Sequence, residues 1–502
     1  MHFRSFLKSS AAVACIMPVT ALADVSAQEV WQDWQGLYES YGYAVTADES
    51  TSAGALTLSN IVMQSILPDD GGEISVRIPT MVMNERGDGT VSVAIPDAIT
   101  ATFEISDDAM DDVSGEIDYL MTGLEMIVSG TPGALDYNLT ASRAAINLTS
   151  LVVDGQPQAI TAASLIAEEF ALRTTSTIEG ELRRSEQDGS ALQVSYNIDM
   201  NDPQNPEVSF LLAGSMARPS ISGWLTAKQG LMDMEDMAKV MADGFAVVSN
   251  LRHEGASVNL VVEGRDAMTM QSASGAGTLD FTLSSEGMGY AASATGVSTT
   301  VIMQELPLPV ELRMAEIGAN FLFPISAGAA PQDFTLGLTL RDLILPDLLW
   351  GMFDPAGQLP RDPATLVLDL AGQATLDKDM MSPDFAQQLD MPMRAENLTV
   401  RDITLRLAGA ELTAQGAFQF DNDAMGAMPG MPNAAGGLDM KLVGGNQLLT
   451  TLTAMGLLPQ EQAMAAQMMM GLFAVPAGDD TLTTRIEITE DGQILANGQR
   501  IQ

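Results

Sequence analysis

Cysteine and histidine are almost absent from this chain of 502 residues. It has one cysteine, Cys15, and two histidines, His2 and His253. A zinc site built from His and Cys needs more ligands than these. A Ser-His-Asp triad in the mature chain would have to use His253, and no Gly-x-Ser-x-Gly motif accompanies it. A single cysteine also forms no disulfide within the chain. Zinc sites built from His and Cys and disulfide-stapled folds are therefore excluded.

Basic residues are also few. Lys and Arg number 23 against 65 Asp and Glu, a net charge of −42, and the only basic doublet is Arg183-Arg184. Binding to phosphate backbones depends on clustered Lys and Arg, so no nucleic-acid partner is expected. Charge alone also disfavours docking on anionic lipid. We interpret the acidity as a source of solubility, with binding of cations or a basic partner as the alternative.

Long hydrophobic runs are missing after residue 23, so the mature chain is predicted to have no transmembrane segment. The N-terminus has a basic start with Arg4 and Lys8, an apolar stretch over 11–22, and small residues at Ala21 and Ala23. This layout predicts a secretory signal peptide over residues 1–23 and export to the periplasm of a Gram-negative bacterium. Cleavage leaves 502 − 23 = 479 residues, with 21 basic against 65 acidic groups, a net charge of −44.

Cys15 supplies an alternative to this cleavage. The preceding Ala12-Val13-Ala14 resembles a lipoprotein box. Too few apolar residues separate Lys8 from Cys15, and Ala12 stands where a larger aliphatic residue is usual. We therefore expect cleavage after Ala23, which removes the only cysteine. A mature chain without thiols suits an oxidising compartment.

Two-residue alternation dominates the remaining sequence. Leu192, Val194, Tyr196, Ile198 and Met200 share one parity, and polar residues occupy the other. The same pattern occurs at 74–78, 258–262, 279–283, 334–340, 366–370, 412–420 and 482–488. Turn signals separate these runs, at 70–72, 87–89, 188–189, 254–255, 286–287, 491–492 and 497–498. One apolar and one polar face per strand indicate a mainly antiparallel β (α+β) fold, a long curved sheet of successive hairpins.

Helices are predicted to be a minority that covers parts of the sheet. Apolar stripes at helical spacing mark residues 30–41, 234–245 and 343–353, and a helical pair over 448–457 and 459–473. Met464, Met468 and Leu472 form a stripe on the second helix of that pair, which we interpret as core. Residues 421–437 lack any period and predict a long flexible connection that interrupts the sheet. The predicted divisions are the signal peptide, a strand-rich region over 24–225, and a second over 226–502 with the helical pair near 446–473.

The 33 methionines are unusually many. Methionine is flexible and polarizable, so it fills irregular cores and also lines permissive apolar grooves. The core is the default interpretation of this excess. A groove for an apolar ligand is the alternative.

Carboxylates are the remaining candidates for chemistry. Asp107, Asp108, Asp111, Asp112 and Glu116 lie within ten residues and are weak calcium candidates, because oxygen clusters suit that ion. The alternative is a solvated acidic loop. His253 lies beside Glu254-Gly255 and is interpreted as a surface-loop residue. No phosphate loop or dinucleotide fingerprint is present, so neither a cofactor nor a catalytic residue is predicted.

Three elements of the C-terminal half carry a family resemblance: residues 359–372, residues 403–416, and the ending from Gly456-Leu457-Leu458-Pro459 to Asn497-Gly498. Together they resemble an uncharacterised family of exported alphaproteobacterial proteins, known only as a domain of unknown function. The ending is more distantly similar to AsmA-like and YdgA-like envelope proteins. That similarity implies a long curved antiparallel sheet with an apolar groove, and in some members a part in lipid traffic. It carries over no functional residues.

The sequence therefore predicts a non-enzymatic periplasmic protein of the cell envelope. It would bind or shield an apolar ligand such as lipid, or scaffold an envelope complex with a protein partner. A hydrolase that uses carboxylates alone and a calcium-stabilised structural module are the alternatives.

Overall fold

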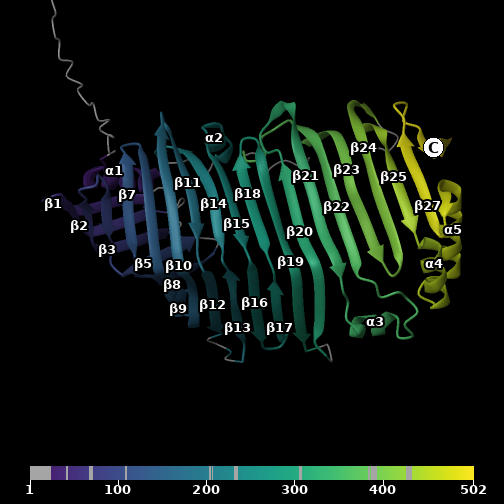
Figure 1. Ribbon diagram of the computed structural model, residues 1–502, viewed down its shortest axis with the longest axis horizontal. Helices are drawn as coiled ribbons and strands as arrows, with labels where there is room; N and C mark the ends of the chain where they lie inside the picture. Colours follow the sequence, from purple (N-terminus) through teal and green to yellow (C-terminus); the bar gives the residue numbers. More distant parts are fainter. Residues whose placement is uncertain are drawn as a thin grey trace, which may run out of the picture.

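The computed structural model describes residues 24–40, 43–66, 72–107, 110–202, 205, 207–230, 236–304, 308–382, 385, 393–425 and 432–501. Its described strands form one antiparallel sheet of 29 strands (Figure 1). The predicted fold class, mainly antiparallel β with few helices, is confirmed. None of the described helices is long and apolar enough to span a bilayer. The predicted signal peptide over 1–23 lies outside the described residues.

The strands succeed one another across the sheet as an up-and-down meander. The first are β1 (Tyr43–Ser52), β2 (Ala55–Ile66), β3 (Gly72–Glu85), β4 (Val91–Ala94), β5 (Ala98–Asp107), β6 (Met110–Thr122), β7 (Glu125–Thr131), β8 (Ala134–Val153), β9 (Gln156–Pro157) and β10 (Ala159–Glu179). The middle strands are β11 (Leu182–Ser190), β12 (Gln193–Asn201), β13 (Ser209–Ala217), β14 (Ser220–Lys228), β15 (Ala246–His253), β16 (Gly255–Glu263), β17 (Met268–Ser274), β18 (Gly277–Ser284) and β19 (Gly287–Met303). The last are β20 (Val310–Phe323), β21 (Gly328–Leu343), β22 (Ala364–Leu376), β23 (Met393–Leu407), β24 (Ala410–Met425), β25 (Pro432–Val443), β26 (Val475–Gly478), β27 (Thr481–Ile488), β28 (Ile494–Ala496) and β29 (Gln499–Arg500).

Many short strands are halves of one long strand. β10 pairs with β11 along one half of its length and with β12 along the other, and β19 pairs in the same way with β18 and β17. β8 does so with β7 and β6. Each of these long strands is therefore interrupted near its middle. The interruptions lie next to one another on neighbouring strands.

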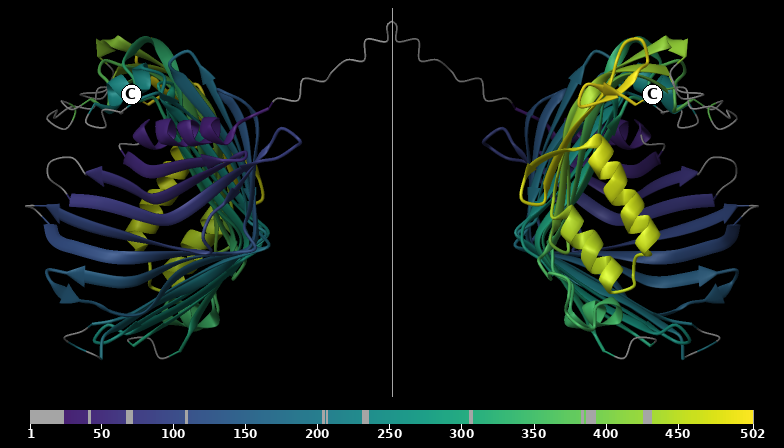
Figure 2. Two further views of the ribbon diagram at one scale, coloured as in Figure 1. Left: turned by 90° about the vertical axis from the view of Figure 1, so that its left-hand side faces the viewer. Right: turned by 90° about the vertical axis from the view of Figure 1, so that its right-hand side faces the viewer.

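These interruptions form a line of irregular backbone, which we call the bulge line. Six of its residues have a positive φ: Asn60, Gly123, Glu169, Arg218, Gly296 and Asp342. Positive φ is uncommon outside glycine and is typical of bulges, which bend a strand. Viewed along the sheet, the strands bend partway along their length, and the sheet is curved into an open trough (Figure 2).

The bulge line keeps the apolar residues on one side of the sheet. Leu58 and Ile61, on either side of Asn60, are three residues apart, and plain alternation would place them on opposite faces. Both are buried in the same cluster, and so are their strand partners Met81 and Ile78. The extra residue at the bulge line therefore returns the apolar side chains to the same face of the sheet. We call this side, to which the N-terminal helix is bound, the inner face, and the other side the outer face.

In the described part of the chain, five helices accompany the sheet: α1 (Ala27–Ser40), α2 (Met237–Ala242), α3 (Asp347–Phe353), α4 (Gly445–Ala454) and α5 (Gln460–Phe473). They match the predicted helical segments. α1 lies within the trough at its N-terminal end, and α4 and α5 lie together at the C-terminal end (Figure 2). Residue 225, the predicted boundary, lies inside β14, which pairs with β11 and β15, so the sheet continues through it.

Three local predictions were wrong. The predicted turn at 188–189 lies inside β11, and the one at 254–255 lies at the break between β15 and β16. The flexible connection over 421–437 is largely strand, because Asp421 pairs with Asn433 and Phe418 with Gly436. Backbone hydrogen bonds do not require apolar side chains, so strands rich in Gly and Ala escape a search for alternation.

Candidate functional site: an open apolar trough

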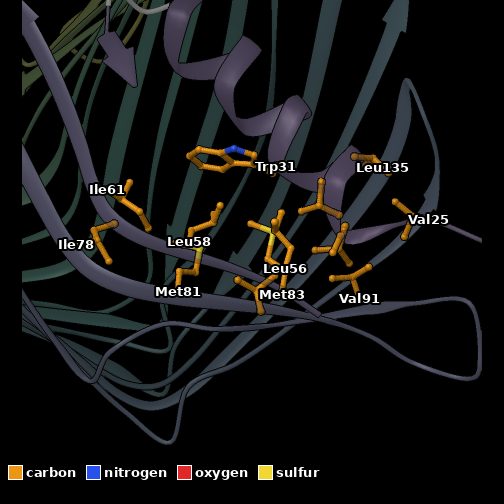
Figure 3. Packing of buried hydrophobic residues seen from close by; sticks show 14 residues of the cluster. Val25, Trp31, Leu56, Leu58, Ile61, Ile78, Met81, Met83, Val91 and Leu135 are labelled. Carbon is orange, nitrogen blue, oxygen red and sulfur yellow. The ribbon is translucent and has the colours of Figure 1, made fainter. Parts of the chain in front are cut away.

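The N-terminal end of the trough holds the largest cluster of buried side chains. Val30 and Trp31 of α1 are 0% and 1% exposed and pack on inner-face residues of β2 to β4, β7 and β8 (Figure 3). The Trp31 indole N–H donates to Glu49 Oε1 of β1 at 2.7 Å. Of the predicted stripe, Val30 is core, Trp34 is half-buried against the cluster, Leu37 is half-buried, and Tyr41 lies outside the described residues. α1 closes this end of the trough.

A buried ion pair fixes α1 to the sheet. Arg183 Nη1 of β11 lies 2.8 Å from Asp33 Oδ1, and each side chain is 8% exposed. Arg183 also donates to Ser176 Oγ, and the Tyr137 hydroxyl donates to Asp33 Oδ2 at 2.7 Å. Burial raises the pKa of Tyr137, and the Asp33 charge raises it further, so the hydroxyl stays a donor. Because all these groups are paired, the cluster works as an anchor.

Beyond α1 the inner face continues as unbroken apolar rows of directly paired residues. One row begins at Met126, which packs on the α1 cluster. It contains Met126, Leu139, Leu172, Gly189, Ile221, Leu251, Leu279, Ala292, Ala319, Leu338, Leu368, Ile403, Ala414 and Met440. A second apolar row crosses the C-terminal strands β20 to β27. It contains Ile317, Leu340, Leu366, Leu405, Leu412, Leu442 and Leu482. Paired residues point to the same side, so these rows line the trough.

The other side of the bulge line is also apolar as far as β16, where Val258 pairs with Ser272 of β17. One row starts at Ile99, which also packs on the α1 cluster. It continues through Tyr119, Ile146, Leu165, Tyr196, Gly214 and Val258. A parallel row contains Met200, Phe210, Val262, Met268 and Met303. Several of the methionines thus lie on the trough wall.

Much of this apolar wall is exposed. Ten inner-face side chains are 36–45% exposed: Ile146, Leu165, Phe210, Ile221, Leu279, Ile317, Leu336, Leu338, Leu366 and Leu405. The sheet is therefore a single layer in the described part of the chain, and its inner face beyond α1 stays open to solvent.

The outer face is mainly polar. Ser195, Ser215, Ser257 and Ser298 lie on one of its rows. Ion pairs join neighbouring strands there, such as Arg341 to Glu316 at 2.9 Å and Arg485 to Asp439 at 2.7 Å. The contrast between the faces leaves the trough as the apolar surface of the molecule.

The predicted calcium ligands are only partly described. Asp108 lies outside the described residues, and the side chains of Asp107 and Asp111 are not described. The Asp112 backbone N–H donates to Asp154 Oδ1 at 3.1 Å, and Glu116 is exposed on β6. Within the described part of the chain, no three acidic, His or Cys side chains gather to hold a metal ion. The calcium site stays a prediction.

His253 is not a loop residue. It ends β15 at the bulge line, half-buried, opposite Gly277. A Cβ on Gly277 would lie 2.4 Å from His253 Nε2, so the imidazole occupies the space that this glycine leaves. The Nδ1 atom is buried and has no hydrogen-bond partner among the described residues. The Glu254-Gly255 pair suggested a hairpin, whereas the chain continues there into β16.

Asp354, which follows α3, is another buried carboxylate and is 0% exposed. It accepts from the backbone N–H groups of Leu359 and Gln358, at 2.8 and 2.9 Å. These bonds lower the pKa of Asp354. The carboxylate stabilises the loop after α3. Asp33 of α1 and Asp354 beside α3 are thus both bound by neighbouring residues of the protein and have structural roles.

The C-terminal helices pack more thinly than α1. Trp350, Leu359 and Ala408 form a small cluster with Leu448 and Leu452 of α4. Asp480 accepts from the first backbone N–H groups of α4, those of Asn446 and Gln447. In α5 only Ala463 is buried. The stripe of Met464, Met468 and Leu472, predicted to be core, is 54%, 65% and 63% exposed, so that prediction was wrong.

Comparison with protein-family models, with curated proteins and with solved structures finds no match for this chain. The trough itself is therefore the evidence on which a function must be argued.

Proposed function

We propose that this protein is a non-enzymatic periplasmic protein of the cell envelope that binds lipid along the inner face of its curved sheet. The observation that carries the proposal is the continuous apolar wall, whose large side chains are 36–45% exposed. Contiguous apolar surface on this scale is rare in soluble monomers and marks binding sites.

The chemistry of the wall favours hydrocarbon as the ligand. The rows offer Leu, Ile, Val, Met and Ala, with few donors or acceptors. Covering one of the exposed leucines would contribute about 1 kcal/mol. Methionine adds adaptable contacts that tolerate ligands of varied shape. An acyl chain, which is long, apolar and variable, fits a long trough better than a compact ligand does.

The predicted signal peptide supports the compartment, because an exported protein meets the lipids of the cell envelope. An envelope protein scaffold is the second candidate. It is supported by the same exposed wall, which could equally be covered by a protein partner. The content of the trough in the purified protein distinguishes the two.

The test is to purify the full protein from the periplasm of its own host, extract it with organic solvent and identify bound lipid by mass spectrometry. Stoichiometric lipid, enriched over a soluble periplasmic control, is expected. Leu405→Asp places a charge on the inner wall at a side chain 45% exposed, and it should reduce the amount of bound lipid measurably. Ile302→Asp is the matched control, since this outer-face side chain is 47% exposed.

Equal lipid in the two variants, or none in the parent protein, would remove the proposal. Crosslinking to envelope partners that depends on Leu405 would then favour the scaffold.

A further inference from the structure

A polar spot lies within the apolar wall, on the middle strands β15 to β19, and we define it by His253, Ser272 and Thr299. The second apolar row, followed from Ile317 towards the N-terminus, continues through Ala294 and Gly277 to His253. Paired residues point to the same side of a sheet, so His253 lies on the inner face. An ionisable ring thus stands at the head of a long apolar row.

The hydroxyl groups of the polar spot lie across the bulge line from His253. The row that reaches Val258 continues through Ser272 of β17 and Thr299 of β19. Ser272 Oγ and Thr299 Oγ1 are 2.9 Å apart and hydrogen-bonded to each other. Two observations therefore place polar groups at the same part of the trough, and of these groups His253 is the one that lacks a partner.

The imidazole of His253 has hydrogen-bonding capacity that the described residues do not use. Its Nδ1 atom is buried and unpartnered, whereas the side chain as a whole is half-buried. The accessible part of the ring therefore lies on its Nε2 side. A buried N–H without an acceptor is rarer in proteins than an unpaired acceptor, so we assign the hydrogen to Nε2. His253 then presents one N–H donor to the trough.

The charge of the surrounding wall limits what this donor can bind. The two apolar rows on the His253 side contain no Asp, Glu, Lys or Arg. Arg183, a basic residue of the inner face beside α1, is buried and paired with Asp33. The chain carries a net charge of −42. An anionic group in the trough would meet repulsion and no counter-charge, whereas an uncharged oxygen needs only the N–H.

We propose that His253 donates a hydrogen bond to the ligand, and that the trough favours uncharged ester lipids such as acylglycerols. The Nε2–H binds the ester carbonyl oxygen, and the acyl chain lies along the second apolar row. This inference rests on the proposed function, because it names the class of lipid that the trough binds. His253 is a specificity-determining residue in this arrangement.

The position of His253 also sets where the acyl chain ends. Neighbouring strands are about 4.8 Å apart, and an acyl chain spans about 15 Å. A chain that starts at His253 therefore crosses about three strand spacings and ends near Ile317.

The experiment measures competition for the trough in the full protein. N-phenyl-1-naphthylamine, an uncharged fluorophore without a carbonyl group, is bound first, and 1-decanoylglycerol then displaces it. His253→Leu keeps the wall apolar and removes the donor, so the affinity for 1-decanoylglycerol should fall about fivefold, the loss expected for one hydrogen bond. The affinity for the fluorophore should stay unchanged.

Two further variants separate the hydrogen bond from a general effect on the wall. His253→Gln supplies a side-chain N–H donor and should restore most of the affinity. Ser249→Leu is the matched control, since it replaces a polar residue of the same strand and face with leucine. It should leave displacement by 1-decanoylglycerol unchanged. Urea denaturation of each variant verifies that the sheet is folded.

Equal affinities of His253→Leu and Ser249→Leu for 1-decanoylglycerol would overturn the proposal. Tighter binding of sodium decanoate than of 1-decanoylglycerol by the parent protein would do the same. In both outcomes the fluorophore still binds, and the trough remains an apolar binding site. A parent protein that binds neither the fluorophore nor lipid would remove both proposals.

Discussion

At the scale of single residues, the buried ion pair between Arg183 and Asp33 is the interaction whose loss should destabilise the protein most. Both side chains are 8% exposed, and removal of one leaves the other charged and unpaired in the interior. Breaking a buried pair in this way typically costs about 3–5 kcal/mol. Asp33→Ala should therefore lower the free energy of unfolding by about 3 kcal/mol, measured by urea denaturation.

Glu186→Ala provides the comparison for that prediction. Glu186 pairs with Arg184 on the same strand, but the two side chains are 58% and 42% exposed. Solvent-exposed pairs contribute about 0–1 kcal/mol. Similar losses in the two variants would mean that the Asp33 pair does not anchor α1.

The environment of Asp354 predicts a dependence of stability on pH. Its pKa in the folded state lies below the ordinary value of 3.8, because backbone N–H groups of Leu359 and Gln358 favour the charged form. The stability it contributes is present above the unfolded pKa and is lost as the pH falls through the lower folded value. The Tm difference between the parent protein and Asp354→Asn should thus be largest near neutrality and shrink below pH 3.8. A constant difference from pH 7 to pH 3 would contradict this.

At the scale of elements, the bulge line shows what alternation in the sequence could not reveal. Runs such as 192–200 correctly predicted strands with one apolar face. The three-residue step from Leu58 to Ile61 breaks that alternation, and only the structure shows that it preserves the face. The Gly-containing pairs at 188–189 and 254–255 were wrongly predicted as hairpin turns for a related reason. Glycine is also found inside strands, at bends and bulges.

Glu169 on the bulge line is held at φ +49°, where a side chain is strained. The left-handed conformation costs about 1–2 kcal/mol for a residue with a Cβ. Glu169→Gly should therefore raise the free energy of unfolding by about 1 kcal/mol, measured by urea denaturation.

The same substitution at Glu186, inside β11, should do the reverse. Glycine in the interior of a strand costs about 0.5–1 kcal/mol. If both substitutions destabilise the protein equally, Glu169 is not strained and the bulge line has a different origin.

At the scale of the whole molecule, the fold class and the helices could be predicted, whereas the open face could not. Apolar alternation states that one side of each strand avoids water, but it does not state what covers that side. In a sandwich the same residues would be core, because a second sheet would return over them. Here the chain continues outward strand by strand, so residues such as Leu366 and Leu405 stay exposed. The α5 stripe was wrongly predicted to be core for the same reason. Helical spacing shows that apolar residues share one face of a helix, but it does not show what packs against that face.

The meander also sets a length. Neighbouring strands are about 4.8 Å apart, so the path from β8 across to β25 covers about 60 Å. One acyl chain spans about 15 Å of a bilayer leaflet. The inner wall is thus several acyl chains long. A surface of this length has room for more than one acyl chain at a time, in contrast to a pocket, which holds a single molecule at one point.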